Sequence, residues 1–454
     1  MEPFDLLGRL WGDDAMAAVW SERATIEAWL RVEAELARAQ AATGVLAEAD
    51  AEMVARAASV DGLDTEALWD GARNVGYPIL PLVRAVAARL PDGPDGRVHY
   101  GATTQDIMDT GLALQGVRAL DRLGELVRTL GDALERLMDA HRRTVMAGRT
   151  HGQQAVPTTF GATLAPLLDE LARHAGRLRQ VRAEIGTVSL FGAGGTSAAA
   201  GPTAAPVRRE LARRLGLAGG DVPWHAARDS VAGFGALCAS VAATCARLAR
   251  NVIDLGRTEI GELAEADGEH RGASSTMPQK ANPILAEAIV GMSASAGASV
   301  SALYRAMEVP QERAAGEWQI EWQVLPRLAW SAASCLAAAV ELVAGLRVDE
   351  DAMRANLDAD GGLVMSEAYM FGLAPELGRE LAHDLVYAAA RQVRRDGVEL
   401  PEALRRQLTE RGLDPAFARE PLSPADYVGD AELICASARD RWHAQRRLIE
   451  EERT

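Results

Sequence analysis

The chain has 454 residues, of which 64 are acidic and 48 are basic, so its formal net charge is −16 at pH 7. This acidic excess argues against nucleic-acid binding, because contacts to phosphates need clusters of Lys and Arg. Hydrophobic residues make up 48% of the chain, which is enough for a sizeable core. At roughly 100–200 residues per domain, the length allows about two to four domains.

Four cysteines lack CxxC spacing, which indicates buried thiols in a reducing compartment rather than a disulfide framework or a zinc site. They are Cys238, Cys245, Cys335 and Cys435. The N-terminal segment has neither the basic nor the apolar region of a secretory leader. The apolar run from Trp330 to Leu346 carries Glu341 and predicts a buried helix rather than a membrane span. We therefore expect a cytoplasmic protein that binds no membrane.

The periodicity predicts an all-α fold. Aromatic residues are only 5% of the chain, and few runs show the alternation typical of a strand. Apolar residues recur at helical spacing from Ile26 to Ala37, with Ser21 and Glu22 as a cap. Longer periodic stretches follow at Asp106–His141, Thr158–Ile185, Val222–Leu263 and Ile284–Ala306.

Helices of this length predict a bundle, since one of about 36 residues would be about 54 Å long. Val231–Ala246 is apolar around most of its circumference, so we expect neighbouring subunits of a homo-oligomer to cover it. Boundaries are predicted at Arg97–Tyr100, after the PDGPDG segment, and near Val348. These give an N-terminal helical domain at 1–103, a long-helix domain at 104–348 and a C-terminal helical domain at 349–454.

In a helical chain, chemistry is expected where polar segments interrupt the long helices. The first such segment is HYGATTQD, His99–Asp106, just before the longest helix. Its hydroxyls and helix N-terminus suit a carboxylate, although Thr104 or Asp106 could simply cap the helix. A Gly-rich segment at Gly192–Gly201 lacks the GK[ST] ending and a clear preceding strand, so we do not expect a nucleotide loop there.

The second segment is GRTHGQQAVPTTFG, Gly148–Gly161. His151 lies in this polar loop, where no apolar periodicity explains it, whereas His174, His383 and His443 are expected to be structural. The histidines are far apart in sequence and form no metal-ligand pattern, so no metal and no cofactor are expected.

The third segment is GEHRGASSTMPQKANP, Gly268–Pro283, a polar Gly-rich loop that ends at a proline before the next helix. A plain loop explains its glycines, serines and prolines. It does not explain Lys280 and Asn282 at their fixed spacing.

The run SSTMPQKANP resembles the SSxMPxKxN signature of the fumarase/aspartase superfamily, which includes argininosuccinate and adenylosuccinate lyases. The other two segments match the remaining signature regions of that family in the same order. Within it, the chain resembles the branch of 3-carboxy-cis,cis-muconate cycloisomerase and nitrosuccinate lyase. The pieces that carry this likeness are GATTQDIMDTGLALQ, PWHAARD, QERAAGEWQIEWQVLP and LDADGGLVMSEA.

The resemblance implies a homotetramer with a central core of 20 helices and four active sites, each built from three subunits. It also implies that Ser274 is the base, activated by Lys280 and backbone amides. Lys280 and Asn282 would hold one substrate carboxylate, and Thr103, Thr104 and the helix N-terminus another. Further predicted substrate contacts are His99, Thr150, Gln153, Arg228, Ser275 and Met277.

Some positions stay open between roles. Arg228 and Arg313 are either substrate contacts or parts of ion pairs at a surface or interface. Asn74, Tyr77 and Trp318 are candidates to read the distal half of the substrate.

Family reactions are β-eliminations from a succinyl-type di- or tricarboxylate. Cycloisomerases of this branch often have Trp or Leu in place of His151, whereas adenylosuccinate lyases keep the THGQ segment found here. An amine must be protonated as it leaves, so His151 as a general acid favours cleavage of a C–N bond in an N-substituted aspartate, with release of fumarate. The sequence Arg9, Leu10, Trp11 replaces the Arg-Tyr pair that binds a nucleotide phosphate, which disfavours a nucleotide substrate.

Three alternatives remain. They are 3-carboxymuconate cycloisomerisation, nitrosuccinate cleavage to fumarate and nitrite, and a non-catalytic relative comparable to the crystallins recruited from argininosuccinate lyase. The presence of Ser274, Lys280, Asn282, Thr103 and His151 disfavours the last.

Overall fold

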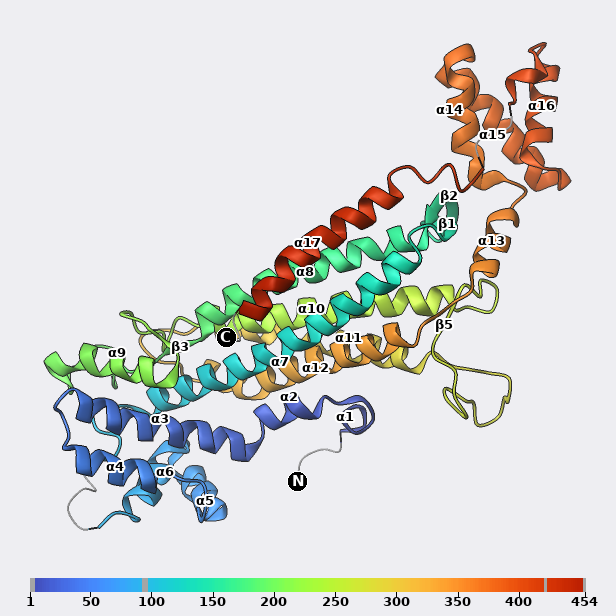
Figure 1. Cartoon of the computed structure of the whole chain (residues 1–454). Helices are drawn as coiled ribbons and strands as arrows, with labels where there is room; N and C mark the ends of the chain where they lie inside the picture. Colours follow the sequence, from blue (N-terminus) through green and yellow to red (C-terminus); the bar gives the residue numbers. More distant parts are fainter. Residues whose placement is uncertain (1–4, 92–96, 420–422, 452–454) are drawn as a thin grey trace. The chain divides into compact units, whose positions relative to one another are not determined.

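The computed structural model describes residues 5–91, 97–419 and 423–451, and for 448–451 only the backbone (Figure 1). The described chain is mostly helical, as predicted. Its helices are α1 Leu6–Trp11, α2 Asp14–Val19, α3 Glu22–Ala42, α4 Glu48–Ala57, α5 Thr65–Val75, α6 Ile79–Ala87, α7 Thr104–Ala140, α8 Phe160–Ile185, α9 Ala204–Leu215, α10 Asp229–Leu255, α11 Ile284–Ala306, α12 Glu317–Ala344, α13 Glu350–Asp358, α14 Ser366–Leu377, α15 Arg379–Asp396, α16 Leu400–Glu410 and α17 Ala431–Glu451.

Short strands form three two-stranded sheets within the described residues. They pair antiparallel as β1 Val145–Thr150 with β2 Gln153–Thr159, parallel as β3 Thr187–Val188 with β4 Ala218–Gly219, and antiparallel as β5 Leu263–Ala264 with β6 Arg347–Val348. Single 3₁₀ turns occur at Gly201–Thr203, Leu363–Met365 and Pro415–Phe417.

The chain divides into two compact units, each built from three stretches of sequence. Unit 1 comprises Met1–Val127, His174–Cys245 and Ala288–Ala337, and unit 2 comprises Arg128–Arg173, Ala246–Glu287 and Ala338–Thr454. The divisions fall inside α7, α8, α10, α11 and α12, so these long helices supply residues to both units. The division into three domains stays a prediction, and residues 92–96 of its PDGPDG boundary lie outside the described residues.

The long helices follow the predicted stretches closely where the apolar period is uninterrupted. The α11 helix has the predicted bounds, and α7 and α8 begin within two residues of theirs. The stretch Val222–Leu263 is corrected to Asp229–Leu255, because a loop containing Pro223 precedes the helix and the chain turns at Gly256. The predicted Trp330–Leu346 helix is the end of α12, which continues through Pro326 back to Glu317.

Three of these helices are long and apolar enough to cross a membrane by length and composition, namely α10, α11 and α12. Within the structure, 67% of the apolar window is buried in α10 and in α12, but only 39% in α11. The α11 helix thus buries the smallest share of its apolar window of the three.

In unit 1, α3 packs against both α4 and α9. The buried residues of α3, including Ile26, Val32 and Leu36, share one core with apolar residues of α5, α6 and α9. Ser21 caps α3 as predicted, since its hydroxyl accepts a hydrogen bond from the Ala24 N–H at 3.2 Å. The cap fixes where the helix begins.

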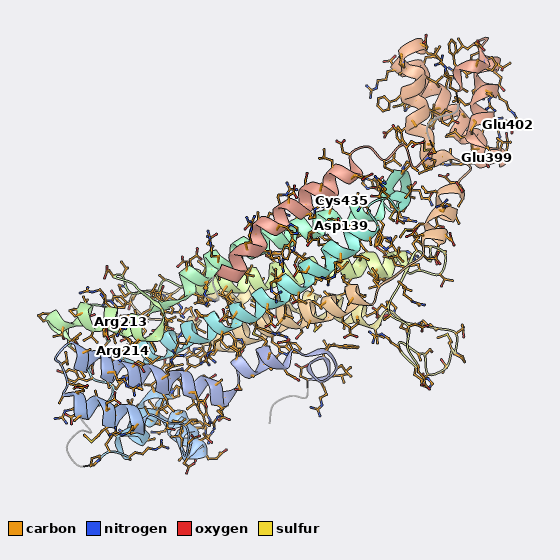
Figure 2. The ribbon with its side chains drawn as sticks, viewed as in Figure 1. Asp139, Arg213, Arg214, Glu399, Glu402 and Cys435 are labelled. Atoms are coloured by element: carbon orange, nitrogen blue, oxygen red, sulfur yellow. The ribbon has the colours of Figure 1, made fainter. Side chains whose placement is uncertain are left out.

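The last turn of α9 carries Arg213, which is exposed, and Arg214, which is half-buried; both are labelled in Figure 2. Both side chains donate hydrogen bonds to the carboxylate of Glu210. The hydrogen bond from Arg213, with the charges of both arginines, lowers the pKa of Glu210 to about 2. Arg213 is 68% exposed, so this is a solvated ion pair that adds little to stability.

In unit 2, α14, α15 and α16 pack side by side (Figure 1). Their shared core includes Tyr369, Leu385 and Leu404, and Ala147 of β1 contributes to it. The four cysteines are buried and form no disulfide, as predicted. Burial raises the pKa of the Cys335 thiol to about 12, so this thiol is not a reactive thiolate at neutral pH.

Within unit 2, α7 and α17 approach closely at Gly131. A Cβ atom at Gly131 would lie 2.1 Å from Cζ2 of Trp442, a side chain that is fully buried. The Trp442 Nε1–H also donates to Asp132 Oδ1 at 3.1 Å, which holds the indole in place. The indole therefore cannot yield to a larger residue without breaking a buried contact.

We expect Gly131→Ala to destabilise the protein by about 1–3 kcal/mol, because the added methyl group overpacks this contact. The matched control is Gly372→Ala in α14, where a Cβ meets nothing within 4 Å. That control should be neutral or stabilise by up to about 1 kcal/mol, because alanine favours an exposed helix more than glycine does. Urea unfolding of both variants checks this, and equal midpoints would contradict the close packing of α7 and α17.

The segment around His151 is a β-hairpin rather than the predicted loop. His151 and Gly152 form the two-residue turn between β1 and β2, with φ values of 52° and 76°. Positive φ at both positions is typical of a type I′ turn, which fits the twist of a hairpin. The sequence did not reveal the strands because residues of Gln153–Thr159 alternate little in polarity.

Candidate functional site

The signature loop, Gly268–Pro283, lies in unit 2 between β5 and α11. Its two ends are tied at Gly272 and Asn282. The Gly272 carbonyl accepts hydrogen bonds from the backbone N–H of Asn282 at 2.8 Å and from its Nδ2 at 2.9 Å. A Cβ atom at Gly272 would lie 2.4 Å from the Asn282 carbonyl oxygen, so this neck requires glycine. One amide hydrogen of Asn282 therefore serves the loop itself.

The tip of the loop presents its polar side chains to solvent. Ser275, Met277 and Lys280 are exposed, and Ser274 is half-buried. The Ser274 hydroxyl oxygen accepts hydrogen bonds from the backbone N–H groups of Thr276 at 3.3 Å and Met277 at 3.1 Å. Donors aimed at a hydroxyl oxygen favour its deprotonated form, which is what a serine base requires.

Lys280 is the single lysine of the chain, and the rest of the 48 basic residues are arginine. The Lys280 side chain is exposed at the tip of the loop. In a sequence that otherwise uses arginine, this one position keeps a compact, flexible ammonium group.

The hairpin that carries His151 also belongs to unit 2. Thr150, His151 and Gln153 are exposed around its turn. The hairpin is anchored below them by Arg149, whose guanidinium donates to both carboxylate oxygens of buried Glu262 at 2.9 and 2.5 Å. The sequence did not predict the pair of Arg149 and Glu262, because no local pattern around either residue indicates a partner more than 100 positions away.

His99 and its segment lie in unit 1. His99 has a φ of 63°, and its Nδ1 lies 2.7 Å from Oε1 of Glu33, a side chain that is fully buried. Burial alone would lower the pKa of His99, but the hydrogen bond and charge of Glu33 outweigh it and raise the pKa above its ordinary value. His99 and Glu33 thus favour an ion pair inside the unit.

This raised pKa predicts how stability depends on pH. The stabilisation from charged His99 is fully present below its unfolded pKa, about 6.5, and is lost as the pH rises through the higher folded pKa. We expect the difference in Tm between the wild type and Glu33→Gln to shrink as the pH is raised through that window. Thermal scans at a series of pH values check this, and a constant difference would show that His99 does not titrate with Glu33.

Asp106 organises the start of α7. Its buried carboxylate accepts backbone hydrogen bonds from Thr103 at 3.0 Å and from Phe191 and Gly192 at 2.9 Å each. His225 Nε2 lies 2.8 Å from the same group. The capping role considered for Asp106 is therefore confirmed, and this residue joins three segments that are far apart in sequence.

Arg313 binds to residues near the start of α7 in unit 1. Its Nη1 donates to Gln105 Oε1 at 2.7 Å and its Nη2 to the Ala193 carbonyl at 2.8 Å. Its described partners are an amide side chain and carbonyl groups rather than a carboxylate, so the ion-pair alternative is not observed within the described residues, and the substrate contact stays a prediction. The Gly192–Gly201 segment thus contributes backbone groups to a structural junction.

Arg228 differs from its prediction as a substrate contact. Its side chain is 1% exposed, and all five of its N–H donors are occupied. They bind both oxygens of Asp109, both oxygens of Glu321 and the Trp224 carbonyl. The ion-pair alternative describes this residue, but the pair is buried within unit 1 rather than at a surface.

The structure therefore divides the predicted site residues between the units. Unit 1 contains His99, Thr103, Thr104 and Arg228, and Thr103 and Thr104 are half-buried at the start of α7. Unit 2 contains the remaining predicted residues, which are Thr150, His151, Gln153, Ser274, Ser275, Met277, Lys280 and Asn282. Their roles in binding and catalysis stay predictions.

Comparison with known proteins identifies the family. A family model described as "Lyase" matches residues 8–296, and one described as "Adenylosuccinate lyase C-terminus" matches residues 362–438. The chain is 39% identical over 437 residues to 3-carboxy-cis,cis-muconate cycloisomerase of Pseudomonas aeruginosa, covering 94% of each chain. It is 35% identical over 434 residues to N-acetyl-S-(2-succino)cysteine lyase of Dickeya dadantii, again covering 94% of each.

Two further similarities cover nearly the whole chain. Nitrosuccinate lyase of Streptomyces davaonensis is 39% identical over 438 residues, with 92% of this chain and 91% of that protein covered. The crystal structure of a 3-carboxy-cis,cis-muconate lactonizing enzyme from Pseudomonas putida superposes with a TM-score of 0.88 at 32% identity, covering 97% of this chain and 99% of that one. With these relatives and the match to the lyase model, the chain belongs to the fumarase/aspartase superfamily of lyases.

Proposed function

We propose that the protein catalyses β-elimination from a 2-substituted succinate, with an N-substituted aspartate as the leading substrate class and fumarate as the product. The observation that supports this most is the signature loop, which carries both the half-buried Ser274 and the chain's single lysine, which is exposed. A base and a cation on one loop suit removal of a proton next to a carboxylate.

The difficult step is the loss of the proton from carbon. As the proton leaves, negative charge accumulates on the neighbouring carboxylate, and donors that are already in place must stabilise it. We assign that role to Lys280 and Asn282, and binding of the second carboxylate to Thr103, Thr104 and the N-terminus of α7. His99, Thr150, Gln153, Ser275 and Met277 remain the proposed further contacts.

Ser274 is the proposed base. A serine hydroxyl is a weak base at its ordinary pKa and needs stabilisation of its alkoxide. The N–H groups of Thr276 and Met277, which donate to the Ser274 oxygen, support this assignment together with the cation Lys280 on the same loop. The proton taken from carbon would reside on the Ser274 oxygen.

His151 is the proposed general acid for an amine leaving group. We expect His151→Gln to lower kcat by roughly 10²–10⁴ with an amine-releasing substrate, because the departing nitrogen would no longer be protonated. The same variant should change little with nitrosuccinate, since nitrite is a weak base. Steady-state kinetics with both substrates check this, and equal losses would make His151 a binding residue instead.

Cycloisomerisation of 3-carboxymuconate is the second candidate, and it is supported by the 39% identity to the Pseudomonas aeruginosa enzyme. In that reaction the same serine and anion sites would serve a tricarboxylate. Cleavage of nitrosuccinate has equal support in identity. Elimination of a thiol is a related possibility, given the relative that is named for a succinylated cysteine.

We also propose that the protein assembles as a homotetramer with active sites shared between three subunits, as the family resemblance implies. The limited burial of α11 supports this, because 39% burial leaves much of an apolar helix for other subunits to cover. Light scattering measures the mass directly, and a monomer would exclude the shared site.

The experiment that tests the function follows the ultraviolet absorbance of fumarate during incubation with the protein. Parallel reactions contain a panel of amines, a panel of thiols, or no added nucleophile, and separate reactions contain 3-carboxymuconate or nitrosuccinate. Amine-dependent loss of fumarate would support the proposal and identify the missing half of the substrate. Loss of the muconate chromophore alone would replace it with the cycloisomerase reaction.

A further inference from the structure

A cavity of about 290 Å³ lies within unit 1, and of the residues named above as candidate substrate contacts only Trp318 is among its lining residues. It is bordered by residues of α3, α5, α7 and α12 and by Trp20. Five of the chain's nine tryptophans line it. They are Trp20, Trp29, Trp69, Trp318 and Trp322. Since roughly 150 Å³ accommodates a benzene ring, the cavity has room for a ring with a short side chain.

The aromatic walls are arranged in contact with one another. Trp318 meets Trp322 edge to face at a centroid distance of 5.0 Å, and Tyr77 stacks on Trp318 at 5.9 Å. On another wall, Trp29 meets Trp69 edge to face at 6.5 Å. Trp29 and Trp318 are buried, whereas Trp322 is 39% exposed. The walls are therefore held by packing, and the indole of Trp322 reaches solvent.

The polar part of the cavity lining is acidic. Asp109 and Glu321 both line the cavity, both side chains are 1% exposed, and both bind the same guanidinium, that of Arg228. Two carboxylates thus share one cation. Burial raises the pKa of both carboxyl groups, although Arg228 opposes this. When both carboxyl groups are ionised, one arginine balances only one of their two negative charges.

The neighbouring titratable groups do not supply the missing positive charge. His225 is the other group that acts on Asp109, and it is itself hydrogen-bonded to Asp106 at 2.8 Å. When Asp106, Asp109 and Glu321 are all ionised, their three negative charges outnumber the positive charges of Arg228 and His225. This holds whether His225 is neutral or protonated. The remaining polar lining consists of Thr25 and Gln115, which hydrogen-bond each other at 3.0 Å.

We propose that this cavity is a binding site for a small organic cation, an amine with an aromatic or alkyl body. Its ammonium group would lie against the indole faces and be attracted by Asp109 and Glu321, while its body would replace water between the tryptophans. Electron-rich ring faces attract cations, and the two carboxylates that line the same cavity favour the same charge. The site concerns binding alone and does not rest on the proposed reaction.

The test is a fluorescence titration of the full-length protein, since tryptophans report directly on this cavity. The probes are benzylamine, phenethylamine and butylamine, each compared with the alcohol of the same skeleton. We expect saturable quenching by at least one amine, with an affinity roughly tenfold above that of its alcohol. Equal affinity for amine and alcohol, or no saturable binding by any of the three amines, would overturn the proposal.

Variants locate the site. Trp322→Leu, which replaces the half-exposed wall, and Glu321→Gln, which keeps the shape but removes a charge, should each weaken amine binding about tenfold. Glu321→Gln should leave binding of the alcohol unchanged. Trp330→Leu is the matched control, because Trp330 is in α12 but does not line the cavity.

The variants also separate binding from folding. Circular dichroism and Tm measurements establish that each variant is folded before it is titrated. Trp318→Leu serves as the second wall variant if Trp322→Leu does not fold. Unchanged amine affinity in a folded wall variant, or a loss as large in Trp330→Leu, would place the binding elsewhere and overturn the proposal.

Discussion

Ser274→Ala is expected to lower kcat by roughly 10²–10⁴ with any accepted substrate while KM changes little, because the base that removes the proton from carbon is lost. The substitution deletes one hydroxyl group from an exposed loop and removes no buried contact. Steady-state kinetics of the purified variant are the measurement. This prediction rests on the proposed function and, unlike that for His151→Gln, applies to every accepted substrate.

Retained binding is the control for this loss. Fumarate should raise the Tm of Ser274→Ala as much as that of the wild type, since the proposed carboxylate contacts are intact. Lys280→Arg should instead weaken this effect, because a planar guanidinium cannot replace a compact ammonium group. Full turnover in Ser274→Ala would refute its role as the base.

Arg228→Leu is expected to destabilise the protein by about 3–5 kcal/mol, because it leaves two buried carboxylates without their shared cation. The side chains of Asp109 and Glu321 are each 1% exposed, and five hydrogen bonds are lost together. Urea unfolding at fixed protein concentration measures the loss. This is the largest effect on stability that we expect from a single substitution.

The matched control for Arg228→Leu is Arg213→Leu, which removes an exposed ion pair on α9 and should shift the midpoint little. Adding Asp109→Asn and Glu321→Gln to Arg228→Leu should recover part of the stability, because neutral amides then replace the two buried carboxylates. Similar midpoints for Arg228→Leu and Arg213→Leu would show that the buried cluster is not essential to folding.

The sequence predicted those parts of the fold that depend on local pattern. Uninterrupted apolar periodicity located α11 with its exact bounds, and Ser21 identified the start of α3. The sequence did not predict the hairpin around His151, because its strands pair with each other without the alternating polarity that identifies a strand in a sequence. The predicted helix began only at Trp330, after Pro326, and so omitted the first half of α12. A proline within a long helix removes only local hydrogen bonds, and α12 continues through it.

The candidate site shows the same limit. The residues of the signature loop were identified from their types and spacing, and the family comparison confirms the family they indicate. The residue pairs that position the segments next to the candidate site could not be predicted from the sequence. Arg149 with Glu262, and Asp106 with His225, are paired only by tertiary structure. Arg228 was noticed for its type, but its burial between two carboxylates depends on residues 119 and 93 positions away.

The single lysine makes one loop of the chain the specific target of lysine-directed reagents. A protease that cleaves only after lysine has one peptide bond available, between Lys280 and Ala281, and would yield two fragments, 1–280 and 281–454. An amine-reactive dye has the same side chain as its one target apart from the chain's α-amino group. Cutting rate and labelling rate thus report on the accessibility of this one loop, without the background that other lysines create in most proteins.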